Sequence, residues 1–271
     1  KESIIDVRLG DHVQKHMAVL FADIRSFTTL SESMTPKENF DFINAYLGRV
    51  SPVIRKHHGF IDKYIGDAIM ALFPETADDA VQASIEIHKQ LDLFNQQRHT
   101  QDLQPVKIGI GLHIGTLMLG TIGEEKRMEG TVISDAVNLA SRLEGLTKMY
   151  GALIIISEEV LIELTDPGQY NYRFLGKVRV KGKLEPVQIF EIMDSEPHAL
   201  MTQKVTLKPL FNQAIDAYYR QQFEQALQKF QQVLAELPQD KAASFYLERC
   251  QHYIEYGIPE DWEGVEALAQ K

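Results

Sequence analysis

The chain has 271 residues, of which 44% are hydrophobic, a composition typical of a globular protein with one large or two smaller domains. Its formal net charge of −10 argues against general binding to nucleic acid, because a surface that binds the phosphate backbone needs clustered lysine and arginine. The single cysteine, Cys250, excludes an intramolecular disulfide and fits a reducing compartment, so we expect a cytoplasmic location.

Residues 1–16 are polar with scattered apolar positions, which suits either a short lead-in strand or the end of a linker helix. The chain starts at Lys1 instead of Met, which indicates either a piece of a longer protein or a processed terminus. We expect a regulatory domain upstream of this stretch. No apolar run approaches the roughly 20 residues that a membrane span needs. No signal peptide is recognisable either, so we predict no membrane segment within this stretch.

Six apolar residues, Met17–Ala22, lead directly into an acid, Asp23. A continuous apolar run of this length predicts a strand covered on both faces. A second stretch, Ile61–Leu72, has a strand-like run that ends at Asp67 and a further apolar run after it. Solvated acids at strand ends are common, but an acid after an apolar run is costly to place without a partner. Two such aspartates can share a pair of divalent cations, and two cations can handle a triphosphate.

A helix is predicted after the first strand. Thr35 can cap it, Pro36 suits its first position, and Glu38 closes a capping box. The helix is predicted to end near Gly59. Apolar residues recur at intervals of three and four, which predicts one buried face made of Phe40, Ile43, Tyr46, Leu47, Val50, Val53 and Ile54.

Helices and strands continue to alternate. Residues 77–98 predict a second helix, and Val106–Gly123 reads as two strands with Gly115 near the turn. The glycines of this stretch indicate close packing, and His113 is interpreted as a core histidine. The alternation predicts an α+β fold, a mixed sheet with helices packed on it. Its remaining elements are a helix at 134–147, a short buried strand at 153–156, and a strand pair at 174–180 and 187–192.

Four motifs follow one another along the chain: FADIRSFT at 21–28, DKYIGDAIMA at 62–71, GIGLHIG at 109–115 and SDAVNLASRLE at 134–144. In this order they resemble the catalytic domain of class III nucleotidyl cyclases. The resemblance implies a ferredoxin-like core with additional elements, and we assign residues 17–195 to this catalytic domain. It also implies an adenylate cyclase that converts ATP to 3′,5′-cyclic AMP and pyrophosphate.

The resemblance implies that Asp23 and Asp67, with the backbone carbonyl of Ile24, bind two divalent cations, Mg²⁺ or Mn²⁺. It further implies that the turn of Ser26, Phe27 and Thr28 holds the terminal phosphates. The physical reason is that a turn entering a helix presents free N–H groups to an anion. Ser26 could also act as an N-cap, and both roles are compatible.

Two residues stand at positions where the resembling family recognises the adenine or guanine base of the nucleotide. In the resembling family, a lysine at the position of Lys63 donates to an adenine ring nitrogen, whereas guanylate cyclases carry an acid there. Thr131 stands where many adenylate cyclases have Asp, and its hydroxyl can accept from the adenine amino group. The pair therefore favours ATP over GTP. Threonine at this position also resembles a subgroup that includes bicarbonate-responsive cyclases, and we leave that response open.

Asn138 and Arg142 are four residues apart on the predicted helix and so share one face. The resemblance implies that Asn138 orients the ribose and that Arg142 stabilises charge on the α-phosphate. Lys181 matches the family lysine that contacts the triphosphate, and Lys183, two residues on, is the alternative.

The resemblance also implies a homodimer with shared sites, in which Asp23 and Asp67 of one chain meet the base, ribose and phosphate residues of the other.

Two alternatives to an adenylate cyclase stay open. The first is another cyclase of the same architecture, although Lys63 argues against a guanylate cyclase, and the Tyr-Ile-Gly-Asp hairpin argues against a diguanylate cyclase. The second is a catalytically silent dimeric signalling module.

After residue 195 the composition changes, and residues 205–271 are predicted to form an all-α tail. We expect it to pack on the cyclase domain or on the domain's copy in a dimer, because one repeat cannot bury its own face. The tail could also dock a protein partner, and an ordinary helical hairpin is the alternative to a repeat. The spacing of one tetratricopeptide-like unit is carried by Leu210, Ala214, Ala226, Phe230, Val233 and Pro238.

Overall fold

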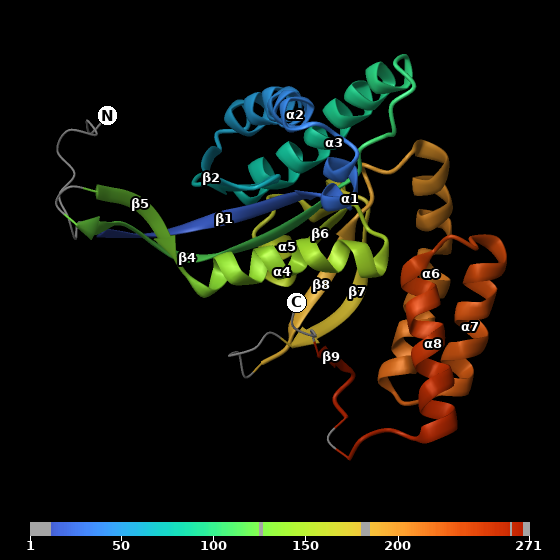
Figure 1. Ribbon diagram of the computed structural model, residues 1–271. Coiled ribbons are helices and arrows are strands. Elements are labelled where there is room, and N and C mark those ends of the chain that lie inside the picture. The colour runs from blue at the N-terminus through green and yellow to red at the C-terminus, as the bar shows by residue number, and fades with distance from the viewer. Residues whose placement is uncertain (1–11, 125–126, 180–184, 261, 268–271) are drawn as a thin grey trace. The chain divides into compact units, whose positions relative to one another are not determined.

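The computed structural model describes residues 12–124, 127–179, 185–260 and 262–267 of the chain (Figure 1). The chain divides into two compact units. The N-terminal unit comprises residues 1–144 and 159–165, and the C-terminal unit comprises residues 145–158 and 166–271. Each unit contains strands and helices, which confirms the predicted α+β class.

The N-terminal unit is built on an antiparallel sheet of β1 (His12–Ile24), β2 (Phe60–Ile65), β3 (Ala68–Phe73), β4 (Ile108–Glu124) and β5 (Arg127–Ile133). The strand order is β2-β3-β1-β4, and β5 pairs with β4. Since β1 begins at His12, residues 12–16 belong to a strand and not to a linker helix.

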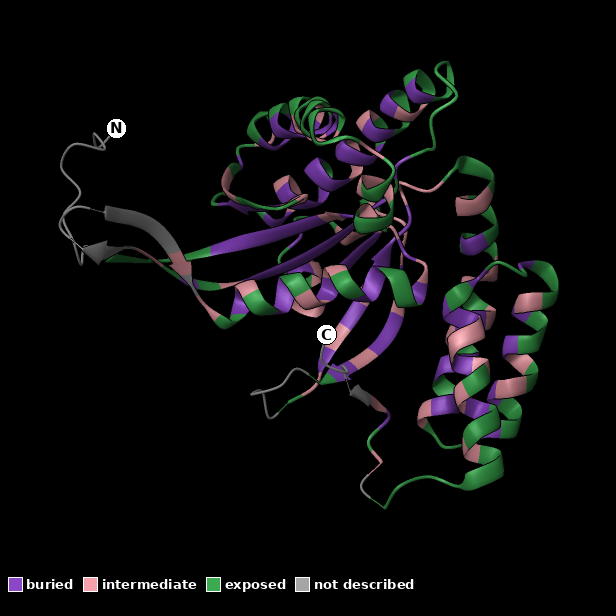
Figure 2. Ribbon diagram, viewed as in Figure 1, coloured by how far each residue is buried: buried purple, intermediate pink, exposed green. Residues whose placement is uncertain are grey.

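Helices cover both faces of this sheet. Met17, Val19 and Phe21 of β1 pack in one cluster with Ala136 and Ala140. Figures 1 and 2 show α1 (Phe27–Glu32), α2 (Pro36–Lys56) and α3 (Ala77–His99) on the opposite side of the buried strands. This two-sided cover explains the continuous apolar run that predicted β1. The unit also contains α4 (Asp135–Tyr150) as far as Glu144 and α5 (Glu158–Ile162) from Glu159 onward.

The start of α2 matches its prediction. The Thr35 hydroxyl accepts a hydrogen bond from the backbone N–H of Glu38, and the Glu38 carboxylate accepts from the backbone N–H of Thr35 at 2.7 Å. The prediction of the buried face is wrong for one residue, since Phe40 is 71% exposed, whereas Phe42 is buried. Phe40 lines an open groove of about 370 Å³ between α1 and α2.

The predicted turn at Gly115 is wrong. β4 runs without interruption through this position, where Gly115 pairs with Met17 of β1. The glycines serve close packing instead. A Cβ atom at Gly111 would overlap the backbone of Glu144 and Ala140 in α4, and one at Gly115 would lie 3.2 Å from the Cβ of Ala136. The strand therefore needs glycine here because a helix crosses it closely.

The C-terminal unit has a mixed sheet of β6 (Ile154–Ser157), β7 (Tyr172–Arg179), β8 (Val187–Ile192) and β9 (Val265–Ala267). Its order is β6-β8-β7-β9, with β9 parallel to β7 and the other pairs antiparallel. The strand β9 was not predicted. A short 3₁₀ turn (Pro167–Gln169) precedes β7, and three long helices follow β8, namely α6 (His198–Tyr219), α7 (Phe223–Glu236) and α8 (Lys241–Tyr256).

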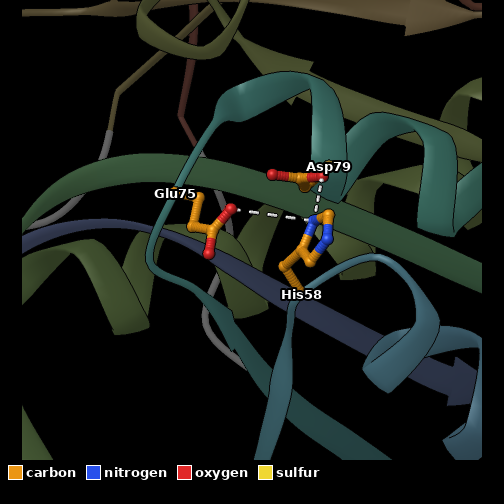
Figure 3. Close-up of side chains that lie close together, drawn as sticks. All are labelled: His58, Glu75 and Asp79. Carbon is orange, nitrogen blue, oxygen red and sulfur yellow. Dashed lines mark hydrogen bonds and ion pairs between the residues drawn. The ribbon is translucent and has the colours of Figure 1, made fainter.

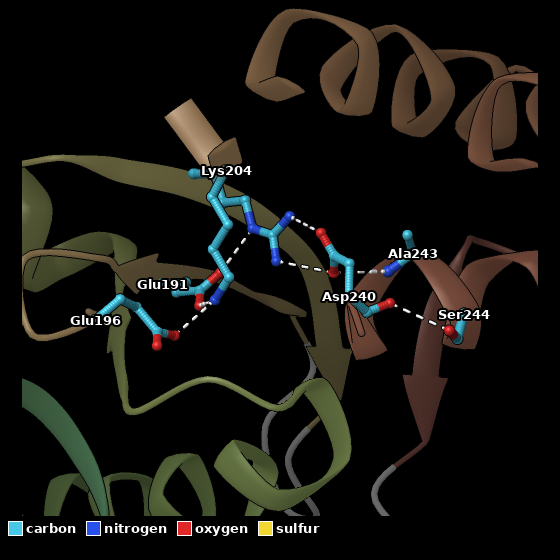
Figure 4. Close-up of polar contacts among 7 residues, drawn as sticks. Glu191, Glu196, Lys204, Asp240, Ala243 and Ser244 are labelled. Carbon is cyan, nitrogen blue, oxygen red and sulfur yellow. Dashed lines mark hydrogen bonds and ion pairs between the residues drawn. The ribbon is translucent and has the colours of Figure 1, made fainter. Parts of the chain in front are cut away.

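A buried ionic network fastens these helices to the strand pair β7–β8 (Figure 4). The guanidinium of Arg173 on β7 donates to Asp240 at 2.6 and 3.0 Å and to Glu191 on β8 at 2.6 Å. The ammonium of Lys204 on α6 donates to Glu191 at 2.5 Å and to Glu196 at 2.6 Å. Each charge has a partner, as buried charges require.

Tyrosines of the tail complete this contact. The Tyr246 hydroxyl donates to the carbonyl of Leu175 at 2.5 Å, and the Tyr219 hydroxyl accepts from the backbone N–H of Lys177 at 2.9 Å. Between them lies Gly176, with φ of 145°, where a Cβ atom would collide with the Tyr246 hydroxyl. The predicted packing of the tail on its own chain is therefore confirmed, whereas its repeat ancestry stays a prediction.

Over the described ranges of the chain, no helix is long and apolar enough to cross a membrane.

Candidate functional site

The two predicted aspartates come together at one edge of the N-terminal unit. Asp23 is next to last in β1, and Asp67 lies in the turn between β2 and β3. The antiparallel register pairs Ala22 with Ile69, so Asp67 falls beside the end of β1. There its carboxylate accepts a hydrogen bond from the backbone N–H of Ile24 at 3.2 Å. The hairpin and the strand thus position both acids by backbone pairing.

The two carboxylates influence each other strongly. Partial burial, together with hydrogen bonding to Asp23 and its negative charge, raises the pKa of Asp67 to about 7. Two carboxylates held this close need a proton or a cation between them. Carboxylate and carbonyl oxygens are the ligands that Mg²⁺ and Mn²⁺ prefer. The residues at this position, with the carbonyl of Ile24 beside them, therefore fit divalent cations.

A buried tyrosine faces the same negative charge. Tyr46 of α2 is 1% exposed, and its hydroxyl makes no hydrogen bond to any described residue. Burial and the charges of Asp23 and Asp67 raise its pKa. The helical period predicts that Tyr46 is buried, which is confirmed, but it gives no indication that the hydroxyl lies near two acids.

The turn after β1 enters α1 at the predicted place. Ser26 is the N-cap residue of α1, with φ of 57°, but its side chain makes no capping hydrogen bond. Ser26 and Thr28 are exposed and Phe27 is half-buried, so the turn is accessible to a ligand. The backbone N–H of Arg25 is already bound to the carbonyl of Lys107 at 2.8 Å.

Lys63 is half-buried on β2, which is the edge strand of this unit's sheet. Its ammonium lies 3.3 Å from the carboxylate of the preceding residue, Asp62. The strand carries a register shift at this position, and sequence reasoning did not foresee it.

The remaining predicted residues lie on other elements. On α4, Asn138 is exposed and Arg142 half-buried, while Ala140 and Leu143 are buried as predicted. In the described part of one chain, neither Asn138 nor Arg142 makes a hydrogen bond or ion pair with the two aspartates. Thr131 pairs with Gly120 across β5 and β4, and its side chain lies outside the described part.

The predicted triphosphate lysine, Lys181, and its alternative, Lys183, both fall within 180–184, outside the described residues. The predicted core histidine, His113, is 4% exposed and lies 3.7 Å from Glu159.

A second group of polar side chains gathers away from the acid pair (Figure 3). The imidazole of His58 lies 3.1 Å from Asp79 and 3.8 Å from Glu75, and the three side chains are close enough to hold a metal ion. The hydrogen bond to Asp79 and the charges of both acids raise the pKa of His58. We interpret the group as an exposed ion-pair cluster that ties the end of α2 to the start of α3.

Comparison with known proteins agrees with the site. The family model of the adenylate and guanylate cyclase catalytic domain matches residues 11–194. An adenylate cyclase from Anabaena cylindrica is 45% identical over 197 residues, which cover 70% of this chain and 39% of the relative. A terminal-differentiation specific adenylate cyclase from Dictyostelium discoideum is 38% identical over 251 residues, which cover 90% of this chain and 12% of the relative. The second likeness therefore extends into the C-terminal helices, and the chain spans less than half the length of either curated relative.

Solved structures show the same fold. The adenylyl cyclase CyaB from P. aeruginosa superposes with a TM-score of 0.61 at 33% identity, covering 67% of this chain and 95% of that one. The guanylyl cyclase Cya2 superposes with a TM-score of 0.60 at 34% identity, covering 70% of this chain and 98% of that one. The fold alone thus does not separate the two nucleotides. Together with the family match and the acid pair, these likenesses establish that the chain belongs to the family of adenylate and guanylate cyclase catalytic domains.

Proposed function

We propose that this chain is an adenylate cyclase that converts ATP to 3′,5′-cyclic AMP and pyrophosphate. The ribose 3′-oxygen forms a bond to the α-phosphorus, and the bond from that phosphorus to the departing pyrophosphate breaks. The observation that carries the proposal is the close pair of Asp23 and Asp67, held at the end of β1 by backbone pairing and by the N–H of Ile24. The names of the two relatives as adenylate cyclases support it.

Asp23, Asp67 and the carbonyl of Ile24 would hold two divalent cations, Mg²⁺ or Mn²⁺. When bound, these cations would lower the pKa of the 3′-hydroxyl and offset charge on the phosphates. No side chain is assigned as a general base, so the 3′-hydroxyl proton passes to water or to the substrate. The role of the protein is then mainly positioning and charge stabilisation.

Further residues would bind the rest of the nucleotide. Asn138 would orient the ribose, and the guanidinium of Arg142 would stabilise the charge that develops on the α-phosphate. Lysine would replace Arg142 poorly, because it lacks the planar fork of donors. The terminal phosphates would contact Lys181 and the turn of Ser26, Phe27 and Thr28.

The choice of ATP over GTP would rest on Lys63 and Thr131. An ammonium can donate to the adenine ring nitrogen, and a threonine hydroxyl can accept from the adenine amino group. A guanylate cyclase is the second candidate, because the chain is as similar to Cya2 as to CyaB. A catalytically silent signalling module would need the loss of a metal or phosphate residue, and all of these residues are present.

The active enzyme would be a homodimer with two equivalent shared sites. Asp23 and Asp67 of one chain would face Lys63, Asn138 and Arg142 of the other. The absence of direct contact between Arg142 and the acid pair within the described part of one chain is consistent with this division.

The proposed catalytic domain spans residues 17–195, between the lead-in at 1–16 and the tail at 205–271. The tail could dock a protein partner, and the reaction would take place in the cytoplasm.

The test is cyclic nucleotide formation by the purified chain, with Mn²⁺ and then Mg²⁺, and with ATP and GTP offered side by side. The proposal predicts cyclic AMP from ATP, little cyclic GMP, and no product from the isosteric variant Asp67→Asn. Comparable cyclic GMP would keep the catalytic assignment but contradict the role of Lys63 and Thr131. No product from a chain shown to be dimeric would contradict the proposed activity.

A further inference from the structure

The edge strand β2 carries a bulge at Asp62, the position before Lys63, which is the lysine proposed to bind the adenine base. Its register pairs Ile61 with Ala71 and Lys63 with Met70, so Asp62 has no partner of its own in β3. A bulge interrupts the alternation of side chains along a strand and re-aims them, often beside an active site. Neighbouring side chains that would otherwise point to opposite faces can then meet.

Asp62 and Lys63 do meet. The ammonium of Lys63 lies 3.3 Å from a carboxylate oxygen of Asp62. The side chain of Asp62 is 11% exposed, against 39% for Lys63. This carboxylate oxygen is itself buried and makes no hydrogen bond within the described part of the chain, so its contact with Lys63 is an ion pair. Asp62 is therefore the more buried member of the ion pair, and the side chain of Lys63 is the more exposed one.

We propose that Asp62 is a positioning residue that fixes the ammonium of Lys63 for recognition of the adenine ring, an inference that rests on the proposed function. The ion pair with Asp62 holds the ammonium in place, and an ammonium has three donors, so one of its N–H groups can point at the base. Adenine offers a ring nitrogen that accepts this hydrogen, whereas guanine carries an N–H there and its carbonyl oxygen beside it. A lysine held by Asp62 cannot swing freely toward that oxygen, and GTP is disfavoured.

Asp62→Asn keeps the size of the side chain and removes its charge. We expect the ratio of kcat/KM for ATP over GTP to fall about tenfold, through a higher KM for ATP and a gain with GTP, because one charge-assisted contact is lost. Asp41→Asn makes the same change at an exposed position of α2 and should leave the ratio unchanged. The Mn²⁺ affinity and the melting temperature of Asp62→Asn should match those of the parent.

Two further variants separate positioning from a structural role. Asp62→Glu keeps the charge and should retain more of the ratio than Asp62→Asn. In a Lys63→Met background, Asp62→Asn should change the ratio no further, since the two residues act as a unit.

An unchanged ratio in Asp62→Asn, equal shifts in the Asn and Glu variants, or additive effects with Lys63→Met would each overturn the inference. If Lys63→Met shifts the ratio and Asp62→Asn does not, the base assignment stands and only the role of Asp62 fails. If Lys63→Met also leaves the ratio unchanged, the assignment of Lys63 to the adenine base and the positioning role of Asp62 both fail.

Discussion

At the scale of single residues, the chemistry of the site depends on the partial burial of Asp67 and on its closeness to Asp23. In the absence of a cation, partial burial, then the hydrogen bond to Asp23 and its negative charge, raise the pKa of Asp67 to about 7 and favour its protonated form. The folded chain therefore binds more protons than the unfolded chain between the ordinary carboxyl pKa and this raised one. Stability of the metal-free chain must fall as pH rises through that interval.

This gives a prediction about pH. Between about pH 5 and pH 8, the metal-free parent should lose roughly 1–2 kcal/mol more of its unfolding free energy than Asp67→Asn, a figure already reduced for partial exposure to solvent. Denaturant unfolding of both proteins over this range, in the presence of a chelator, measures the difference. Added Mn²⁺ should stabilise the parent more at high pH, because cation and proton compete for the same carboxylate. Parallel pH profiles for the two proteins would contradict the coupling.

Local signals predicted much at this scale. The exchange of hydrogen bonds between Thr35 and Glu38 follows from residue types alone, and so does the placement of Asp23 after an apolar strand. The bulge at Asp62 could not be predicted, because a register shift depends on the neighbouring strand. Phe40 fits the helical period of its neighbours but is exposed, since the groove beside it has no cover within the described chain.

At the scale of elements, glycine in β4 shows why a turn was predicted wrongly. A glycine inside an apolar stretch marks a turn, a bulge or a close approach, and only the tertiary structure separates them. Here α4 crosses Gly111 so closely that its backbone occupies the place of a side chain.

A matched pair of glycine variants tests this account. Gly111→Ala should lower the unfolding free energy by roughly 2 kcal/mol or more, because the added methyl overlaps the backbone of α4. Gly48→Ala should raise it by about 0.5–1 kcal/mol, because Gly48 lies in α2 with open space around it and alanine favours a helix. Urea unfolding measures both. Equal effects of the two variants would show that α4 does not press on β4.

The buried network of the tail belongs to the same scale. Arg173 and Asp240 are 67 residues apart in sequence, so no local pattern could pair them. Asp240 also caps α8 by accepting from the backbone N–H of Ala243 at 3.1 Å. Asparagine caps a helix about as well as aspartate, so Asp240→Asn removes the charge and keeps the cap.

We expect Asp240→Asn to lower the unfolding free energy by about 3 kcal/mol, because it leaves the guanidinium of Arg173 buried with one fewer anion. Asp216→Ala, at an exposed position of α6, should change it by less than about 0.5 kcal/mol. Thermal or denaturant unfolding of both variants measures these two changes in free energy. A small effect of Asp240→Asn would mean that water solvates the guanidinium in place of the lost carboxylate. The ion pair of Arg173 and Asp240 would then not hold the tail on β7.

At the scale of the whole molecule, both halves of the proposed site are present in one chain. The acid pair lies at the end of β1, and Asn138 and Arg142 lie on α4. A site shared between two copies then predicts two equivalent sites in a homodimer and no activity in a monomer. This division follows from the family resemblance, since the sequence of one chain contains no information on which copy supplies each residue.

Mixing two inactive variants tests the central claim most directly. Asp23→Ala and Arg142→Ala should each give no cyclic AMP alone, because every site lacks one essential side chain. After equal mixing and exchange of subunits, half of the dimers carry one intact site of two, so about a quarter of the parental activity should return. No recovered activity, from a mixture shown to contain mixed dimers, would contradict a cyclase site shared between two copies of this chain.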